Sequence, residues 1–506
     1  MIENTVTLPR ISDYPAHHAS KAPMSLAVAG DGERLTYGEF AARIDACARA
    51  LLGAGITHGD RVATLSTPSA DHLVLFMATA RIGAIWLGLN PKATYDELAY
   101  QVADAEPRLL FTISEFEGRD HLSDCQRLCR EHACLEAVFT IGGGEQFDTN
   151  IDPEAWQTAL DNVKPEDPAL IVYTSGSTGQ PKGALLTHRG MVTTGRIQCH
   201  HWWAAPFRIL NNIPINHVGG AVQLAGQAIV AGGANVLMSR FRPEEIPAFI
   251  AREGVTVIHQ VSAMYQMIID RGEPERHDLS SLQALIWSGS ACSGDQVAQL
   301  RTWCANLFTS YGQTEVGGEV LFTVPGESDE VLTSTVGYPT EGIEVRLADG
   351  GELQVRGPTV MAGYWRRPEA TSETFTSDGW LRTGDILTES PDGVFRIAGR
   401  LKEMFKSGGY NVYPREIEIV LEGHPGVAIA AVVAVDDSVY AEVGHAYVQP
   451  ETGATLDMAG LEALCREKLA NYKIPKRFIL RHTLPTLPVG KVDKAKLRDE
   501  ANSSRT

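Results

Sequence analysis

The sequence predicts an α/β protein. We expect a large N-terminal domain of parallel sheets covered by helices, then a small β-barrel-like subdomain and a small, mobile α+β C-terminal domain. Short apolar runs alternate with longer amphipathic stretches over most of the chain, as strands and helices do in a parallel sheet. Near Val336 this rhythm gives way to strands that follow one another directly. Beyond Lys402, strand and helix alternate again before a Pro/Gly-rich segment at 484–490.

The elements of the N-terminal domain follow from these runs in chain order. Residues 61–66 are a predicted strand and residues 70–87 a predicted helix. Further strands are predicted at 108–113, 135–141, 169–173, 234–239, 255–261, 282–288 and 306–310. Helical stretches lie between most of these strands, so the strands should be parallel, with ligands bound beyond their carboxyl ends.

The later elements are shorter. Residues 344–347 and 352–356 flank Ala348-Asp349-Gly350-Gly351 and predict a β-hairpin, which opens the small antiparallel subdomain. A strand at 427–435 and a helix at 461–469 are predicted beyond it. We place the domain boundary so that the N-terminal domain covers 1–400 and the C-terminal domain covers 401–506.

Composition restricts the function classes. The 506 residues are 44% hydrophobic and 21% charged, which suits a globular protein with large cores, and the formal net charge is −18. That charge disfavours nucleic acid or an anionic membrane surface as the main partner. No signal peptide and no apolar run long enough for membrane insertion is visible, so a cytoplasmic location is expected.

Eight cysteines are scattered along the chain and do not suggest a disulfide framework. One group has helical spacing and raises the question of a metal site: His121, Cys125, Cys129, His132 and Cys134. It contains no C-x-x-C pair, so buried cysteines on an amphipathic helix are the favoured interpretation. Whether the group binds anything stays open.

The most informative motif is the segment Tyr-Thr-Ser-Gly-Ser-Thr-Gly-Gln-Pro-Lys-Gly at 173–183, directly after a predicted strand. A loop of this kind offers backbone N–H groups, hydroxyls and one cation to phosphate oxygens. It is not G-x-x-x-x-G-K-[ST], because Pro181 and Gly183 replace the second glycine and the hydroxyl residue. A different nucleotide chemistry is indicated, and a plain flexible surface loop is the weaker alternative. The predicted phosphate-binding residues are Thr174, Ser175, Gly176, Ser177, Thr178, Gly179 and Lys182.

Two further segments follow predicted strands at the same sheet edge: Trp-Ser-Gly-Ser at 287–290 and Ser-Tyr-Gly-Gln-Thr-Glu at 310–315. A strand-end aromatic such as Tyr311 can stack on a purine, and the Thr314 hydroxyl can reach a phosphate. The carboxylate of Glu315 can hold Mg²⁺. The alternative is a tight turn that carries a surface glutamate.

Together and in this order, the motifs resemble the adenylate-forming superfamily, which includes acyl-CoA synthetases, adenylation domains of nonribosomal peptide synthetases, and luciferases. The resemblance runs from about residue 35 to residue 491. It implies a ligase that activates a carboxylic acid with MgATP as an acyl-adenylate and releases pyrophosphate. Coenzyme A then displaces AMP to give the thioester.

The resemblance also implies individual roles. The catalytic residues would be Lys491, Thr314, Glu315 and His217, with Glu315 as the metal ligand. Besides the phosphate loop, the nucleotide would contact Ser288, Gly289, Ser290, Ser310, Tyr311, Gly312, Gln313, Asp385 and Arg400. Lys402 occupies the hinge position, where many acyl-CoA synthetases have aspartate. The thiol tunnel would use Lys406, Ser407, Gly408 and Gly409.

The identity of the acid is the open question. Amino-acid-activating relatives have Phe-Asp at the pocket entrance, whereas this chain has His217 there and no aspartate. Binding an ammonium group would need a buried carboxylate, so an acid without an amine is expected. The implied acyl pocket is His217, Val218, Gly219, Gly220 and Gly317, whose small residues suggest a bulky aromatic, alicyclic or medium- to long-chain acid. The alternative is that these glycines serve turns and close packing.

Three rival interpretations remain. One is a stand-alone adenylating enzyme that loads an acyl carrier protein in place of coenzyme A. A second is a luciferase-like oxygenase, which no motif here demands. The third is a non-catalytic nucleotide-binding protein, which the intact candidate ligands to ATP and Mg²⁺ disfavour. Many members of the superfamily are dimers, so a homodimer is an expected assembly.

Overall fold

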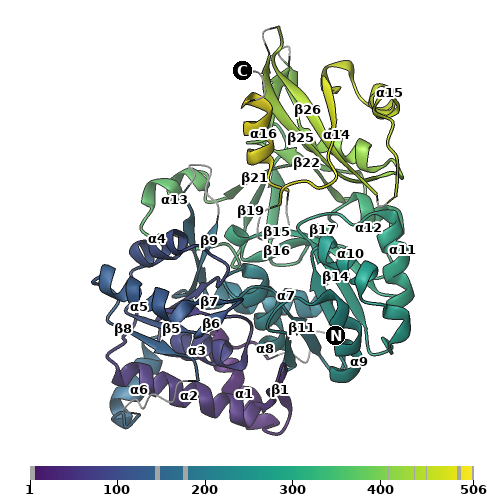
Figure 1. Cartoon of the computed structure of the whole chain (residues 1–506). Coiled ribbons are helices and arrows are strands. Elements are labelled where there is room, and N and C mark those ends of the chain that lie inside the picture. Colours follow the sequence, from purple (N-terminus) through teal and green to yellow (C-terminus); the bar gives the residue numbers. More distant parts are fainter. Residues whose placement is uncertain are drawn as a thin grey trace. The chain divides into compact units, whose positions relative to one another are not determined.

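The computed structural model describes residues 6–142, 149–174, 180–407, 410–437, 439–451, 453–486 and 492–503. The chain divides into two compact units (Figure 1). Unit 1 consists of Met1–Glu344 and Val355–Leu381, and unit 2 consists of Val345–Gln354 and Arg382–Thr506.

A seven-stranded sheet forms one half of unit 1, in the order β20-β10-β9-β4-β3-β5-β8. Strands β9, β4, β3, β5 and β8 are parallel, and β10 and β20 extend the edge in antiparallel fashion. The bounds are β3 Arg61–Leu65, β4 Ile85–Leu89, β5 Leu109–Thr112, β8 Ala137–Thr140, β9 Pro168–Thr174, β10 Lys182–Thr187 and β20 Gly363–Tyr364.

A nine-stranded sheet forms the other half of unit 1, in the order β17-β16-β15-β14-β13-β11-β12-β1-β2. The strands from β15 to β1 are parallel, and β16, β17 and β2 are antiparallel edges. The bounds are β1 Leu26–Gly30, β2 Leu35–Thr36, β11 Arg208–Asn211, β12 Ala234–Leu237, β13 Val257–Gln260, β14 Ala284–Ser288, β15 Leu307–Gln313, β16 Gly318–Phe322 and β17 Tyr338–Pro339.

The helices of unit 1 begin where the sequence provides caps. Thr36, Ser69, Thr94 and Ser293 each form a capping box with the residue three positions later, which satisfies N–H groups that the first helical turn leaves free. The bounds are α1 Tyr14–Lys21, α2 Tyr37–Gly53, α3 Ala70–Arg81, α4 Tyr95–Ala105, α5 His121–Glu131, α6 Pro153–Asp161, α7 His188–His201, α8 Gln227–Ala231, α9 Ile246–Glu253, α10 Ser262–Arg271, α11 Gly294–Trp303, α12 Asp329–Ser334 and α13 Pro368–Thr374. Short elements are η1 Ile11–Asp13, the π-helix η2 Gly219–Gly226, η3 Pro243–Glu245, η4 Pro274–Arg276, η5 Thr314–Val316, β6 Glu115–Phe116 and β7 Arg119–Asp120.

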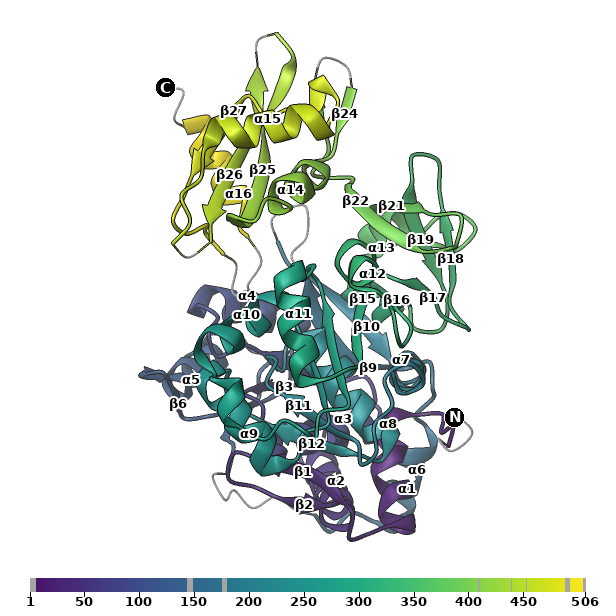
Figure 2. The same cartoon turned by 90° about the vertical axis from the view of Figure 1, so that its right-hand side faces the viewer.

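The two faces of the nine-stranded sheet differ. Helices α9, α10 and α11 lie along one face (Figure 2), and their apolar side chains form one core with Ile258, Leu285 and Leu307. Along the strands the side chains alternate between faces, so His259 and Ser288 point to the opposite face, toward α7 and η2. That second face carries the polar residues.

Unit 2 is built around two sheets. A four-stranded sheet, order β18-β19-β21-β22, has most of its residues in this unit, and a second sheet has the order β24-β23-β26-β25 with β27 paired to β26. Helix α14 packs on β25 over a core that includes Ile417, Leu421 and Val432. The bounds are β18 Glu344–Leu347, β19 Glu352–Arg356, β21 Leu381–Glu389, β22 Phe395–Arg400, β23 Phe405–Ser407, β24 Tyr410–Val412, α14 Pro414–Glu422, β25 Val427–Asp437, β26 Ala441–Pro450, α15 Met458–Lys468, η6 Asn471–Lys473, β27 Arg477–Leu480 and α16 Lys494–Ser503.

The predicted α/β class and the small C-terminal domain are confirmed, and each predicted strand is found within a few residues of its expected place. The helix predicted at 70–87 is wrong beyond Arg81, where α3 ends. Gly83 then adopts a left-handed φ of 73°, and β4 starts at Ile85. Left-handed glycine commonly ends a helix, and the continuous apolar run hid this change. Among the described helices, none combines the length and apolar character needed to span a membrane.

The approach of β15 to β16 provides a stability test. A Cβ atom on Gly312 would lie 1.8 Å from the carbonyl oxygen of Gly318, so Gly312→Ala must push the strands apart. We expect a loss of more than about 2 kcal/mol of unfolding free energy. The matched control is Gly294→Ala at the exposed start of α11, where a Cβ would meet nothing within 4 Å. Thermal or urea unfolding of both variants checks this, and equal stabilities would contradict it.

Candidate functional site

The predicted phosphate loop connects two neighbouring antiparallel strands. Strand β9 ends at Thr174 and β10 begins at Lys182, and these two residues are direct cross-strand partners. The loop therefore closes a β-hairpin, whereas G-x-x-x-x-G-K-[ST] loops lead into a helix. The predicted residues Ser175, Gly176, Ser177, Thr178 and Gly179 lie outside the described part of the chain.

Glu315 lies next to this loop. Its Oε1 accepts hydrogen bonds from the Thr174 hydroxyl at 3.0 Å and from the Tyr364 hydroxyl at 3.0 Å. The three residues come from η5, β9 and β20. The structure thus brings together two predicted site residues from distant parts of the sequence. A half-buried carboxylate beside two hydroxyl oxygens is a donor set that fits Mg²⁺.

Tyr364 is a site residue that the sequence analysis missed. Its hydroxyl contacts Glu315, and the ammonium group of Lys182 lies 5.2 Å from the centre of its ring. Burial raises the pKa of Tyr364, and the Glu315 carboxylate raises it further, so the phenol stays a neutral donor. Tyr364 therefore connects the loop lysine with the candidate metal ligand.

The predicted strand-end residues lie close together at the ends of β14 and β15. Ser288 and Ser310 are direct partners across β14 and β15, and Tyr311 is buried beside them. The Ser290 hydroxyl lies 2.7 Å from that of Ser262, whereas the buried Ser310 hydroxyl has no hydrogen-bond partner among the described residues. Gly289, with φ of 78°, follows Ser288, and Gly312, Gln313 and Thr314 complete the turn into η5.

Four of the five predicted acyl residues lie at the start of η2, and the fifth, Gly317, lies at the end of η5. His217 is exposed, and its Nδ1 accepts a hydrogen bond from the N–H of Gly219 at 3.0 Å. Val218 and both following glycines are buried. A Cβ on Gly220 would lie 2.6 Å from a carbonyl oxygen of Pro214, and one on Gly317 would lie 2.2 Å from that of Thr359. Close backbone packing accounts for these two glycines, and their place in an acyl pocket stays a prediction.

A buried carboxyl group lies on β16, a strand that was not predicted from the sequence. Glu319 is 1% exposed and accepts hydrogen bonds from the amides of Gln198 at 2.9 Å and Gln223 at 2.5 Å. His259 Nε2 lies 3.5 Å from Glu319 and 2.9 Å from the Ser288 hydroxyl. Burial raises the pKa of Glu319 to about 8 and lowers the pKa of His259 to about 3, so both groups are mainly neutral at pH 7.

Unit 2 holds the remaining predicted residues. Asp385 and Arg400 are partners across β21 and β22, and their side chains form an ion pair at 2.9 Å in which Asp385 is buried and Arg400 is exposed. Lys402 and Lys406 are exposed, and Ser407 is buried. Gly408, Gly409 and Lys491 lie outside the described residues.

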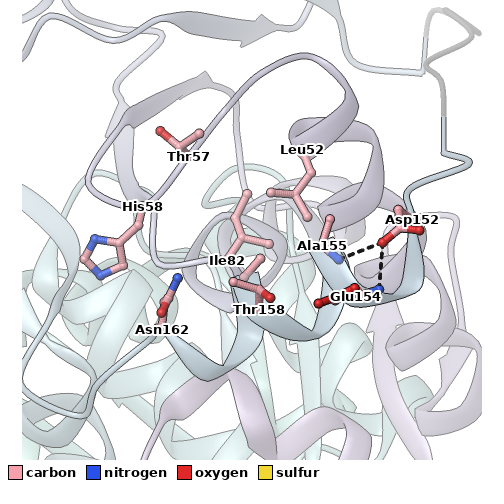
Figure 3. A pocket seen from close by; sticks show the side chains of 10 residues that line it. Leu52, Thr57, His58, Ile82, Asp152, Glu154, Ala155, Thr158 and Asn162 are labelled. Carbon is pink, nitrogen blue, oxygen red and sulfur yellow. Dashed lines mark hydrogen bonds between the residues drawn. The ribbon is translucent and has the colours of Figure 1, made fainter.

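Two other features do not belong to this site. A pocket of about 540 Å³ lies between α6 and the ends of α2 and α3, and His58, Asp152 and Asn162 are among its lining residues (Figure 3). None of the predicted site residues lines it. The cysteine group of α5 does not converge, since the described residues contain no cluster of three or more metal-ligating side chains.

Comparison with known proteins identifies the family. Residues 15–365 match the AMP-binding enzyme family, and residues 416–491 match the AMP-binding enzyme C-terminal domain. The chain belongs to the AMP-binding enzyme family. The superfamily resemblance stated above is therefore confirmed.

Relatives and solved structures agree with this assignment. A feruloyl-CoA synthase of an Amycolatopsis species is 34% identical over 96% of this chain and 98% of its own length. The 3-[(3aS,4S,7aS)-7a-methyl-1,5-dioxo-octahydro-1H-inden-4-yl]propanoyl:CoA ligase of Rhodococcus jostii is 32% identical over 94% and 95%. The crystal structure of ATP-bound MatB from Rhodopseudomonas palustris superposes with a TM-score of 0.84 at 26% identity, over 98% of this chain and all of the other. The predicted enzyme class, an AMP-forming acid–thiol ligase that uses ATP, Mg²⁺ and coenzyme A, is confirmed.

The Tyr364–Glu315 contact makes a prediction for this AMP-binding enzyme. Tyr364→Phe removes a hydrogen bond that positions Glu315, so the apparent Mg²⁺ constant in ATP-dependent pyrophosphate release should rise about tenfold. Tyr95→Phe removes a similar tyrosine–glutamate bond, to Glu131, away from the site and is the matched control. A magnesium titration that gives the same constant for both variants would refute the positioning role.

Glu319 makes a prediction about pH. Its pKa in the folded protein lies above the unfolded value, so the folded state binds more protons, and stability falls as pH rises from about 4.5 to about 8. Glu319→Gln removes this dependence. We expect the stability of the variant relative to the wild type to increase by a few kcal/mol between pH 5 and pH 8.5. Urea unfolding at the two pH values measures this, with Glu275→Gln at an exposed position as the control. A constant difference would show that Glu319 is ionised when folded.

Proposed function

We propose that this protein is an ATP-dependent carboxylic acid–CoA ligase for a bulky, largely hydrophobic acid, with the site residues named above in the roles that the resemblance implies. The observation that carries the proposal is the contact of Glu315 with Thr174, at the start of the phosphate loop. It joins the candidate metal ligand to the candidate phosphate cradle, which is what a nucleotide-activating site requires.

In the first step, a carboxylate oxygen of the acid attacks the α-phosphorus of ATP. The bond from that phosphorus to the bridging oxygen breaks, and pyrophosphate leaves. Thr174, Lys182 and the loop between them hold the leaving phosphates. Lys491 stabilises charge on the transferring phosphate and the bridging oxygen. Mg²⁺ bound at Glu315 would neutralise phosphate charge. Tyr311 stacks on the adenine, and Asp385 and Arg400 bind the ribose and the nucleotide.

In the second step, the sulfur of coenzyme A attacks the acyl carbon of the adenylate. The bond to the AMP oxygen breaks, the thiol proton goes to solvent, and AMP leaves. A mixed anhydride already has a good leaving group, so no protein nucleophile is needed. We propose a hinge at Lys402 between domains 1–400 and 401–506, with Lys406, Ser407, Gly408 and Gly409 along the path of the thiol. These glycines leave room for a thin pantetheine arm.

The acid is proposed from the residues at its entrance and from the relatives. His217 stands at the gate, and the relatives named above activate feruloyl and methyl-dioxo-octahydroindenyl propanoyl substrates. An aromatic or alicyclic acid is accordingly the first candidate, ahead of a medium- or long-chain fatty acid. We further propose a cytoplasmic location and a homodimer. The acyl carrier protein is the alternative acceptor and is not favoured, because the relatives named here are CoA ligases.

Pyrophosphate release with a panel of aromatic, alicyclic and aliphatic acids, with and without coenzyme A, tests the function. We expect acid-dependent release that yields AMP and an acyl-CoA thioester. Lys491→Ala should lower kcat/KM for adenylation about 100- to 1,000-fold. Lys496→Ala, five residues further along the chain and exposed, is the matched control and should retain full activity.

The outcomes separate the rivals. Acid-dependent release of pyrophosphate without any thioester would identify a different acceptor, such as a carrier protein. No release with any acid of the panel would refute the proposed ligase. Equal losses in the two lysine variants would refute the role of Lys491.

A further inference from the structure

The polar network around Glu319 joins two strands of the nine-stranded sheet to two helical elements outside it. Glu319 lies on β16, Gln198 on α7, Gln223 on η2 and His259 on β13. All four side chains are buried, and the other three each contact Glu319 within 3.5 Å. Each buried polar side chain needs hydrogen-bond partners in place of water. A cluster of four in a hydrophobic core therefore calls for an explanation.

The network borders the predicted acyl and nucleotide residues on two sides. On one side, Ser288 is only partly buried, and its hydroxyl contacts His259 at 2.9 Å. On the other side, Gln223 Oε1 lies 3.3 Å from where a Cβ of Gly219 would be. Gly219 in turn donates its N–H to His217. The network therefore extends into the interior from the place where the acyl group is proposed to bind.

The network also has unused hydrogen-bonding capacity. Within the described part of the chain, Gln198 Oε1, His259 Nδ1 and the indole N–H of Trp202 have no partner. Trp202 follows Gln198 by one helical turn, and its ring centre lies 5.1 Å from that of His259. A buried polar atom left unpaired costs about 1–3 kcal/mol. A bound molecule that pairs with these atoms would recover that free energy.

We propose that the acid activated by this protein carries a hydroxyl group remote from its carboxylate, and that the network of Glu319, Gln198, Gln223 and His259 binds this hydroxyl. The inference rests on the proposed ligase function and specifies its substrate class. A hydroxyl both donates and accepts, so it can pair with an unused acceptor such as Gln198 Oε1 and an unused donor such as the Trp202 indole.

The charge state of the network determines whether it favours a hydroxyl or an ammonium group as its ligand. An amine-bearing acid requires a buried carboxylate, and Glu319 is a buried carboxyl group. However, burial raises the pKa of Glu319 to about 8, and the pKa of His259 is lowered to about 3. Both groups are then mainly uncharged at pH 7. A neutral network matches a neutral hydroxyl, whereas an ammonium group would need the ionised carboxylate.

The test uses matched acids with the wild-type enzyme. One aromatic, one alicyclic and one aliphatic acid are each supplied in hydroxylated, unsubstituted and amino forms, for example 4-hydroxycinnamate, cinnamate and 4-aminomethylcinnamate. The readout is kcat/KM for acyl-CoA formation. We expect the hydroxylated form to exceed its unsubstituted parent about 10- to 100-fold in at least one of the three skeletons.

Variants then assign the preference to the network. Glu319→Met removes the hydrogen-bonding group and should bring the hydroxyl-to-parent ratio close to one, whereas Glu319→Gln keeps a neutral hydrogen-bonding group and should retain most of it. Gln223→Met should lower the ratio as well. Gln227→Met is its matched control, because Gln227 is also buried one turn later and its side-chain amide makes no hydrogen bond to the described residues. If Glu319→Met does not fold, the comparison of Gln223→Met with Gln227→Met still tests the proposal.

Each outcome is decisive. Three results would overturn the hydroxyl site. In the wild type, these are a hydroxyl-to-parent ratio of kcat/KM near one for all three skeletons, or a preference for the amino form. The third is a ratio that Gln223→Met and Gln227→Met both leave unchanged. Thioesters would still form in those cases, so the ligase function would stand. Absence of pyrophosphate release with every acid would overturn the ligase function and the hydroxyl site together.

Discussion

The approach of β15 to β16 at Gly312 and Gly318 is the constraint on which the site depends. The two backbones come so close that a Cβ atom on Gly312 would lie 1.8 Å from a carbonyl oxygen. Because no side chain intervenes, the chain turns back through Thr314–Val316 at the carboxyl edge of the sheet. This turn places Glu315 and Glu319, only four residues apart in the sequence, in different surroundings. Glu315 lies half-buried beside the phosphate loop, and Glu319 lies in the interior.

The second half of the site comes from the other sheet of unit 1. The hairpin of β9 and β10 fixes Thr174 directly opposite Lys182, so the loop between them starts and ends at adjacent points. Strand β20 pairs with β10 and adds Tyr364, whose hydroxyl reaches the same Glu315 oxygen as Thr174. Glu315 is thus the point where the two sheets of unit 1 share a hydrogen-bonded residue. The start of the proposed phosphate loop and the proposed cation ligand therefore lie side by side, although they are far apart in the sequence.

Much of the site was predictable, because the positions of strands and of the residues that follow them depend only on the local sequence pattern. Apolar runs located the strands, and parallel topology placed Thr174, Ser288 and Glu315 at strand ends. The hydrophobic pattern gave a wrong prediction at 70–87. A helix and a strand, both apolar, follow each other closely there and form one continuous apolar run in the sequence. Tyr364 was missed because its strand is two residues long and gives no pattern. Glu319 was missed because Gly-Gly-Glu has the composition of an exposed turn, and only the pairing of β15 with β16 buries it.

Glu319 shows why residue type alone is a poor guide to the charge of a site. From the sequence, the lack of an aspartate beside His217 argues for an acid without an amine. The structure places a buried carboxyl group, Glu319, against Gln223 of η2, and its surroundings favour the same conclusion. Two amides, the Ser288 hydroxyl and a neutral imidazole surround Glu319 without a cation among its described contacts, so hydrogen bonds offset only part of the cost of burying a negative charge. The carboxyl group keeps its proton and acts as a hydrogen-bonding group, and what it selects is polarity in the acid and not positive charge.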